Sequence, residues 1–453
     1  MAIIIAWISI AVCLIALVMT IALQRRMRFT LALPLGYMIN LLLIHLPGAY
    51  AFAISGGRFV GLSRFEDSIS TGIALTAVGA ISFVAGLAIG SAGHRLMPWE
   101  KPDPARFKDP RFSAFCLISG WVLAFGVGAL RDIPTLGAAI YYGSVVWMLV
   151  AASNLAQAVR QSSAPQFAIW SGVVLSYPAL VLLLSGFMSY GAIAVIIVGS
   201  LTVSHTKTLM RSLLLIVALG FLGISVFVNY FGARSELRST LWSGARLEQR
   251  VSAVSSAFSD FELFSPGNPD HLRALSMRLN QNEFVGLAAD RLANGQVEYR
   301  KGASLYESLV AVVPRIVWKD KPATGGGGTL VRELTGLNLS GKSAWGVGNV
   351  LEFYSAFGLW SMIPCFIGLG WLLGWLDRKS ASLLGSADPS RSFLYFLPAV
   401  TLIQPIGSIV EIVGGVFAAL LAAVALRMAW KLVQEIGQAP AGQTANALPR
   451  GLQ

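Results

Sequence analysis

The chain has 453 residues, of which 55% are hydrophobic and only 12% are charged, and its mean hydropathy is +0.67. Soluble domains carry about 25% charged residues, so the composition excludes a water-soluble enzyme and indicates a membrane protein. The net charge of +12 would also suit a nucleic-acid partner. Basic residues on the inner loops that orient membrane spans explain it more simply, and we expect no nucleic acid to bind.

The first apolar run covers residues 2–23, and the basic stretch at 24–28 follows it rather than preceding it. This order predicts a retained membrane span, not a cleaved signal peptide. The three cysteines, Cys13, Cys116 and Cys365, lie in long apolar stretches, where no disulfide framework or zinc cluster can be assembled. We expect no metal and no other cofactor.

Apolar runs of membrane-spanning character recur along the chain, since a hydrocarbon core about 30 Å thick needs roughly 20 apolar residues per helix. They are residues 2–23, 29–50, 69–92, 112–130, 138–158, 167–185, 188–204, 212–231, 350–376, 392–407 and 409–430. The stretch 392–430 is continuously apolar and too long for one span. Pro405 and Gly407 predict a turn that makes it a hairpin. The sequence therefore predicts an all-α polytopic membrane protein with about eleven spans.

Lysine and arginine are concentrated in alternate connections between these spans. The rich set holds Arg25, Arg26, Arg28, Arg95, Lys101, Arg106, Lys108, Arg111, Arg160, Lys207, Arg211, Arg378, Lys379, Arg391, Arg427 and Lys431. The opposite short connections hold only Arg58, Arg64 and Arg131. The positive-inside rule then predicts an external N-terminus and a cytoplasmic C-terminus, which an odd number of spans requires.

One long hydrophilic segment, residues 232–349, interrupts the spans and carries 14 Lys or Arg and 11 Asp or Glu. We call it the insert and expect a mainly helical extracytoplasmic domain, because long loops translocate largely regardless of charge. The expected division is 1–231 for spans 1 to 8, 232–349 for the insert, 350–432 for spans 9 to 11 and 433–453 for a cytoplasmic tail.

Three helix signals lie within the insert. Asp270 or a neighbouring residue is placed to cap a helix over 271–292, with Asn294-Gly295 as its end. Ser304 to Glu307 matches a capping box that opens a second helix. Pro314 is expected to close that helix near the membrane surface.

Three glycine patterns need a structural reading. Gly86-Leu-Ala-Ile-Gly90 and Gly370-Trp-Leu-Leu-Gly374 match the small-xxx-small spacing by which helices approach closely, and we assign them to packing. Residues 336–343 match the GxxxxGK[ST] pattern of a phosphate-binding loop. That loop works only between a buried strand and a helix, so we interpret Lys342 as a solvated loop residue.

The most distinctive string, PRIVWKDKP at 314–322, puts three cations and a tryptophan just before the chain re-enters the membrane. Arginine binds diphosphate oxygens in a bidentate fork, and tryptophan settles at an interface or stacks on a sugar. Arg315, Lys319 and Lys321 are thus candidates for binding a diphosphate, beside Trp318. The alternative is an anchor that faces lipid headgroups.

Carboxylates at span ends form a second feature, because intramembrane acids are expensive and mark functional sites. Glu352 opens the ninth span within GNVLEFYSAFG, Glu411 opens the last, and Gln404 ends the one before it. All three are expected near the outer face, beneath the insert, and His45 ends its own span there. For Glu352 the structural alternative is an ion pair with an arginine of the insert.

These motifs together resemble the oligosaccharide repeat-unit polymerases of the O-antigen and exopolysaccharide (Wzy-type) family. The resemblance rests on Arg278-Leu-Asn, on Tyr299-Arg-Lys-Gly302 leading into PRIVWKDKP, and on GNVLEFYSAFG, about 130 residues in all. Family members typically show PRxxWPxKP and then E-x-Y-x-x-F-G. Lys319 stands here where a proline is usual, and Ser355-Ala-Phe357 replaces Leu-Asn-Phe.

The resemblance implies a GT-C-like architecture in the bacterial inner membrane. It also implies transfer of a glycan from undecaprenyl diphosphate to the terminal sugar of another lipid-linked repeat unit, beside a flippase and a chain-length regulator. In such a reaction, the residues expected to bind diphosphate or sugar are Arg278, Arg315, Trp318, Lys319, Lys321, Tyr354, Arg234 and Arg238. The first candidate for the general base is Glu352, followed by Glu411, Glu283 and His271.

Three other functions stay open. An O-antigen ligase would share the donor and the large outer loop but hand the glycan to a lipid core. A flippase or exporter would also fit many spans, although transporters tend to show internal repeats and midplane charges, and neither is found here. A scaffold subunit would leave the candidate residues scattered. An intramembrane protease is disfavoured, because no serine and histidine pair lies on plausible helices.

Overall fold

The chain was analysed as a computed structural model, which describes residues 1–27, 29–57, 66–92, 109–126, 130, 133, 136–313, 318, 320, 326–338 and 345–438. Every regular element in these ranges is a helix, and none of them is a strand. The expected all-α class is therefore confirmed for the described part of the chain.

Eight helical segments in the described ranges are long and apolar enough to cross a membrane. They are α1 (Ala2–Arg26), α2 (Leu33–Ile54), α3 (Glu66–Ala92), α5 (Leu136–Ser144) with α6 (Trp147–Gln161), α7 (Ala164–Ser185), α9 (Leu209–Trp242), α16 (Leu359–Leu384) and α18 (Ile409–Gln438). Many of their large apolar side chains are exposed, such as Val217 at 68%. The chain is a helical membrane-embedded protein.

The remaining three expected spans form shorter helices. Residues 112–130 fall on α4 (Pro110–Trp121) and the π-helix η1 (Val122–Gly126), and residues 188–204 on α8 (Met188–Ser204). Residues 392–407 give only α17 (Phe393–Leu402), which at 1.5 Å per residue is about 15 Å long. The turn expected at Pro405 and Gly407 is present, since α18 does not begin until Ile409.

The expected single helix over 350–376 is wrong. The structure separates α15 (Asn349–Phe357) from α16 at Gly358, whose φ of 66° and ψ of −141° belong to a region open only to glycine. The Ser361 hydroxyl accepts the Phe357 N–H at 2.9 Å and donates to the Phe353 carbonyl at 2.6 Å. These bonds satisfy the backbone where the helix breaks, so Glu352 lies on a short helix of its own.

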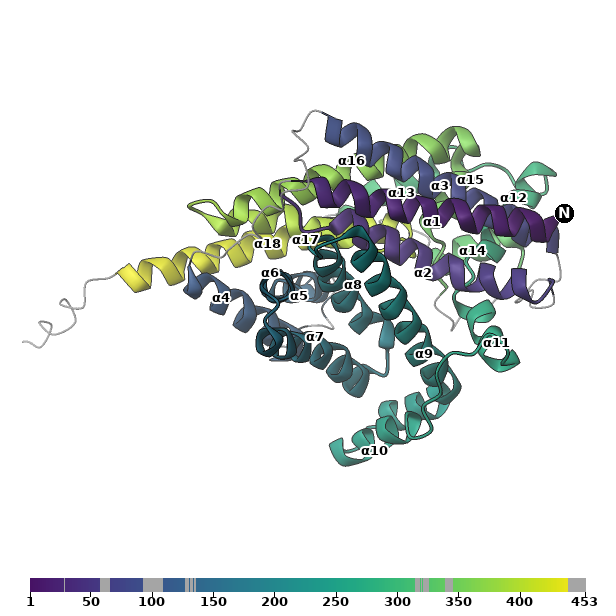
Figure 1. Cartoon of the computed structure of the whole chain (residues 1–453). Helices are drawn as coiled ribbons and strands as arrows, with labels where there is room; N and C mark the ends of the chain where they lie inside the picture. Colours follow the sequence, from purple (N-terminus) through teal and green to yellow (C-terminus); the bar gives the residue numbers. More distant parts are fainter. Residues whose placement is uncertain are drawn as a thin grey trace, which may run out of the picture.

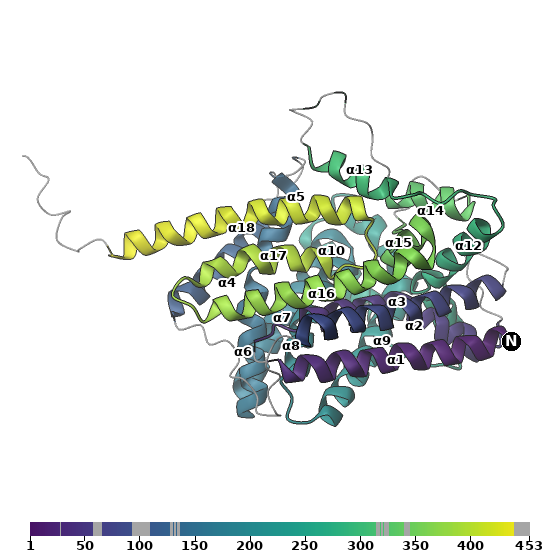
Figure 2. The same ribbon diagram turned by 90° about the horizontal axis from the view of Figure 1, so that it is seen from above.

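The long helices run side by side in an elongated bundle (Figures 1 and 2). One end gathers the N-terminus with α12 (Asn282–Ala293), α14 (Gly327–Thr335) and α15. The helix α11 (Pro269–Arg278) packs against α2 and α9, while α10 (Leu247–Ala257) projects to one side (Figure 1). We call the end that holds α11, α12, α14, α15 and the break between α17 and α18 the insert end.

The opposite end, called the basic end, is held by polar contacts that involve Arg25, Asp377 and Arg427. Asp377 accepts the backbone N–H groups of Leu31 and Leu33 at 2.9 and 3.1 Å and so caps the start of α2. The Arg25 guanidinium donates to Ser212 at 2.8 Å, and Arg427 pairs with Asp388 at 3.2 Å. These contacts tie α1 to α9, α16 to the start of α2, and α18 to the segment that follows α16, far from the insert.

The expected helix over 271–292 is also wrong, since α11 ends at Arg278 and α12 starts at Asn282. Between them the Leu279 carbonyl accepts the Gly48 N–H at 2.9 Å, and the Gln281 N–H donates to the Ile44 carbonyl at 3.0 Å. These bonds to the end of α2 replace those that a continuous helix would make. The helix α12 does end just before Asn294 and Gly295, as predicted.

The capping box expected at Ser304 is absent from α13 (Ala303–Val312), whose N-cap is Gly302 at φ 85°. Glu307 instead accepts from Arg300 at 2.6 Å. An arginine that lies four residues before the expected cap has captured the carboxylate, because a charge-assisted bond is stronger than a bond to a neutral N–H. The helix ends at Val312, and Pro314 lies outside the described residues.

The insert is joined to the bundle by contact of backbone on backbone. A Cβ added to Gly286 of α12 would lie 1.6 Å from the Ser68 carbonyl oxygen of α3, and one added to Gly72 of α3 would lie 1.9 Å from the Asn282 carbonyl oxygen. Asn282 also accepts from Thr76 at 2.9 Å and bonds to His45 at 2.8 Å. Because α12 is buried along almost its whole length, it belongs to the core.

A close backbone contact at glycine residues also joins α3 to α16, as the small-xxx-small spacing predicted. A Cβ on Gly86 would lie 1.9 Å from the Ile367 carbonyl oxygen, and one on Gly370 would lie 2.1 Å from that of Phe83. The packing interpretation of both motifs is therefore confirmed.

We predict that Gly286→Ala separates α12 from α3 and lowers the free energy of unfolding by at least about 2 kcal/mol, as overpacking does. Gly220→Ala in α9, where a Cβ would meet nothing within 4 Å, is the matched control and should leave stability unchanged or slightly higher. Thermal unfolding of the two variants in detergent measures the difference. Equal melting temperatures would contradict the backbone contact.

Candidate functional site

Glu352 lies at the insert end, where α15 is fixed against the break between α17 and α18. The Gly348 and Asn349 N–H groups donate to the carbonyls of Ile406 and Pro405 at 3.2 and 2.8 Å. Glu352 is only 2% exposed. Its Oε2 accepts the N–H of Ile409, the first residue of α18, at 2.7 Å. The positive end of that helix therefore stabilises the carboxylate.

The pKa of Glu352 is raised from 4.5 to about 7, chiefly because burial penalises the charged form. The bond from Ile409, the Ser304 hydroxyl and the charge of Arg300 lower this pKa, while the charge of Glu411 raises it. Since Oε1 makes no hydrogen bond to the described residues, one oxygen is fixed and the other can accept a proton. A carboxylate with these properties suits a general base near neutral pH.

Glu411 lies beside Glu352 at the start of α18 but has a helix-capping role. Its Oε2 accepts the Ser408 N–H at 3.0 Å, and its own N–H donates to the Ser408 hydroxyl at 3.2 Å. This reciprocal pair is a capping box. The cap accounts for Glu411, so Glu352 is the better candidate for a base.

Three arginines converge on Tyr230 at the same end. Arg234 and Arg238 project from the last turns of α9, and Arg278 ends α11. Arg238 donates to the Tyr230 hydroxyl at 3.1 Å, and that hydroxyl donates to the Gly186 carbonyl at 2.8 Å. We call Arg234, Arg238 and Arg278 the arginine cluster.

The arginine cluster is a concentration of unneutralised positive charge. The pKa of Arg278 is lowered by burial and then by the charges of Arg234 and Arg238, so the three guanidiniums are near neighbours. Within the described residues no carboxylate forms an ion pair with any of them, and the Arg278 Nε is buried without a partner. Partly buried cations without a counter-charge are costly, which makes this cluster a candidate anion site.

Aromatic rings flank the arginine cluster. The Arg278 guanidinium lies 4.7 Å from the centre of the Trp345 ring, and that of Arg238 lies 4.3 Å from the centre of Phe187. Trp345 in turn meets Phe284 of α12 edge-on at 5.4 Å. Cation–π contacts orient the guanidiniums without neutralising them.

The backbone from Trp345 to Glu352 connects the arginine cluster to the buried acid. Four extended residues followed by one helical turn span at most about 20 Å. The cluster and Glu352 therefore lie at the same end of the bundle, one short segment apart.

The other predicted residues have different surroundings. His271 accepts the Ser265 N–H at 3.1 Å and lies 3.5 Å from Glu262, so it holds its own loop in place.

Glu283 is buried in the first turn of α12, and Trp318 is 39% exposed. The Tyr354 ring lies 6.5 Å from that of Tyr299, and burial raises the Tyr354 pKa to about 12. Arg315, Lys319 and Lys321 lie outside the described residues.

Two residues of this region were given no role by the sequence. Arg300 lies close enough to Glu352 to influence its ionisation, but its guanidinium is already paired with Glu307 and Glu333, at 2.6 and 3.2 Å. Trp345 carries the contact between Arg278 and α12. Neither residue has a local sequence signal, since both act through residues distant in the chain.

The phosphate-loop pattern at 336–343 fails on structure as well. Gly336 ends α14 at φ 70°, so a helix stands where such a loop needs a strand.

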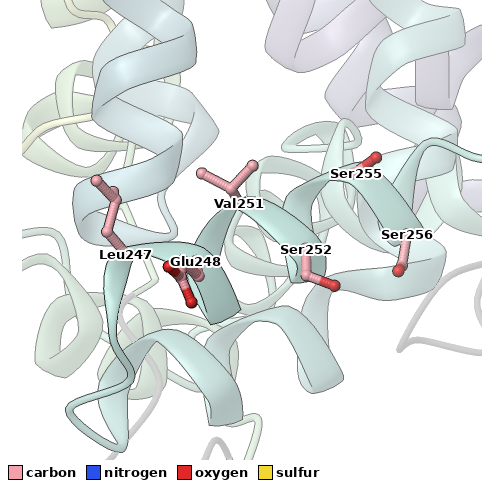
Figure 3. Close-up of a pocket in the computed structure, with 6 residues that line it drawn as sticks. All are labelled: Leu247, Glu248, Val251, Ser252, Ser255 and Ser256. Atoms are coloured by element: carbon pink, nitrogen blue, oxygen red, sulfur yellow. The ribbon is translucent and has the colours of Figure 1, made fainter.

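A separate hollow beside α10 is lined by Leu247, Glu248, Val251, Ser252, Ser255 and Ser256 (Figure 3). It lies along one helix, includes no cation or aromatic ring, and is not part of the site.

Comparison with known proteins places the chain in one family. It belongs to the family described as a domain of unknown function (DUF8712), whose model matches residues 58–386. This stretch holds the arginine cluster and Glu352 and ends before Glu411. No curated protein and no solved structure matches the chain.

We predict that Glu352 makes the stability of the protein depend on pH. Its folded-state pKa of about 7 lies above the usual 4.5, so protonation favours the folded state. The contribution of Glu352 to the free energy of unfolding is complete below about pH 4.5. It is lost as pH rises through 7, which lowers the free energy of unfolding by about 3 kcal/mol. Thermal unfolding from pH 5 to 8 should show this loss in the wild type but not in Glu352→Gln. Parallel curves would contradict the burial of the acid.

Proposed function

We propose that this membrane protein is a glycosyltransferase that polymerises lipid-linked oligosaccharide repeat units, using a polyprenyl-diphosphate donor. The observation that carries the proposal is an arginine cluster for which the described residues supply no carboxylate partner. It lies at the same end of the bundle as a buried glutamate with one hydrogen-bonded oxygen and one unbonded oxygen. Guanidiniums suit a departing diphosphate. A glutamate with a pKa of about 7 suits proton removal from a sugar hydroxyl. The resemblance to the Wzy-type family supplies the substrate class, and it alone supports a GT-C-like architecture.

The distribution of charge supports an outer location for this site. Arg25, Arg378 and Arg427 lie at the basic end, opposite the insert. By the positive-inside rule that end faces the cytoplasm, which puts the N-terminus and the insert outside. Counting α4 with η1, α8 and α17 as short crossings beside the eight long ones gives the eleven passes that this orientation requires. We propose the inner membrane of a bacterium as the location.

The reaction needs no nucleotide, because the glycosyl diphosphate stores its own energy. The acceptor hydroxyl oxygen bonds to the anomeric carbon of the donor. The bond from that carbon to the phosphate oxygen breaks, and its electron pair leaves with the diphosphate, which the arginine cluster binds. The hydroxyl proton passes to Oε1 of Glu352. Positively charged donors that are fixed in advance lower the barrier without reorganising.

We predict that Arg278→Ala and Glu352→Gln insert normally but extend chains about 10²- to 10³-fold more slowly, as loss of a preorganised donor does. Purified protein given only lipid-linked repeat units is the assay. The controls are Arg273→Ala, an exposed arginine on the same helix α11, and Glu298→Gln, 90% exposed at its side chain. Both controls should keep wild-type rates.

The same assay separates the alternatives. A ligase would not extend repeat units supplied without a lipid core, and a flippase would extend nothing. A deletion strain should accumulate single repeat units on the carrier at the outer face. Normal long polymer from both site variants would refute the site, and wild-type protein that extends no chains would refute the function.

A further inference from the structure

Four polar side chains surround the break between α17 and α18, a place where apolar residues would be expected in a membrane bundle. Asn40 of α2 donates to the Ile403 carbonyl at 2.9 Å. Asn349 of α15 donates to the Tyr37 hydroxyl at 3.1 Å. Gln404 lies within the break itself, next to Pro405, whose carbonyl accepts the Asn349 N–H at 2.8 Å. The break is thus a polar junction between α2, α15 and the facing ends of α17 and α18.

Three buried polar atoms at this junction have no hydrogen-bond partner in the described part of the chain. They are Oδ1 of Asn349, Oε1 of Glu352 and Nε2 of Gln404. Asn349 and Glu352 are 1% and 2% exposed, and three residues apart on α15 they share one helix face. Turning the Asn349 amide over does not remove the deficit, because one of its two polar atoms is still left unpaired.

Unpaired buried polar atoms are costly, so a group of three that includes the proposed base indicates a ligand that satisfies them. With the two amides oriented as in the structure, the set offers two acceptors and one donor. A phosphate has only acceptors and would be repelled by the oxygens of Asn349 and Glu352. A metal ion would be repelled by the Gln404 N–H. Neighbouring sugar hydroxyls both donate and accept, and they match the set.

We propose that Asn349, Gln404 and Glu352 form the acceptor subsite, which holds two adjacent hydroxyl groups of the terminal sugar of the acceptor. One hydroxyl donates to Glu352, to which it gives its proton on transfer, and its oxygen accepts from Gln404. The other donates to Asn349. This inference rests on the proposed glycosyl transfer and assigns two residues that neither the motifs nor the family resemblance marks as ligands. Ile406 within the same break is 41% exposed, so the subsite lies near the surface of the bundle.

The experiment separates acceptor binding from donor activation. The probe is the repeat-unit oligosaccharide released from the carrier of a deletion strain and labelled with a fluorophore, offered to full-length protein together with lipid-linked donor. Two rates are measured: transfer to the labelled acceptor as its concentration is varied, and transfer to water. Asn349→Ala and Gln404→Met should raise the acceptor KM about five- to twentyfold, as expected for one lost hydrogen bond. The rate of transfer to water should stay within about twofold of wild type.

Thr401→Val and Asn40→Leu are the matched controls, since they remove hydrogen bonds to the Pro398 and Ile403 carbonyls near the same break without touching a proposed ligand side chain. Both should keep the wild-type acceptor KM. An unchanged acceptor KM in Gln404→Met, with transfer intact in the wild type, overturns the acceptor subsite and leaves the proposed function standing. Equal rises in KM in the variants and the controls also overturn it, because they would mark a structural effect. Wild-type protein that transfers to neither acceptor nor water overturns the function itself.

Discussion

The contact between α12 and α3 is the interaction on which the rest of the site depends. Gly72 and Gly286 bring the two backbones so close that no side chain fits between them, and the buried bonds of Asn282 to His45 and Thr76 fix their register. Phe284 of α12 then supports Trp345, which supports Arg278. Small residues are how membrane helices pack closely where the hydrophobic effect offers little. Here they hold a polar insert against the bundle.

Charge is distributed unevenly over the two ends. At the basic end the buried Asp377 is saturated by hydrogen bonds, and Arg25 and Arg427 have bonding partners. At the insert end the arginine cluster has no described carboxylate, and Glu352 has one free oxygen. Satisfied polar groups stabilise a fold, whereas unsatisfied ones cost free energy and are retained where a ligand completes them. Arg25, Arg378 and Arg427 at the basic end also have one buried nitrogen each without a partner among the described residues, so the two ends differ in how charge is paired with carboxylates and not in every polar atom.

Hydropathy sufficed to predict the membrane class, Pro405 with Gly407 predicted the break, and the small-xxx-small spacing predicted the packing glycines. Glu352 became a candidate as a carboxylate at a span end, and Arg278 through the family resemblance. Prediction from the sequence failed where partners distant in the chain decide. The helix expected over 271–292 breaks because Leu279 and Gln281 bond to α2, more than 200 residues away. The capping box expected at Ser304 does not form because the Glu307 carboxylate accepts a hydrogen bond from Arg300. The unpaired atoms of Asn349 and Gln404 have no signature in sequence, because the hydrogen-bond partners of a buried amide depend on residues that only the fold brings close.

The most direct test of this arrangement is a disulfide between the insert and the bundle. The Thr76 hydroxyl and the Asn282 amide oxygen lie 2.9 Å apart, so cysteines at these positions would face each other across the contact between α3 and α12. With Cys13, Cys116 and Cys365 replaced, mild oxidation of the folded Thr76→Cys, Asn282→Cys protein should form one intramolecular bond, seen as the loss of both free thiols. Two thiols that stay reduced and react independently with a maleimide would show that α12 does not pack on α3, and the site assembled around that contact would fall with it.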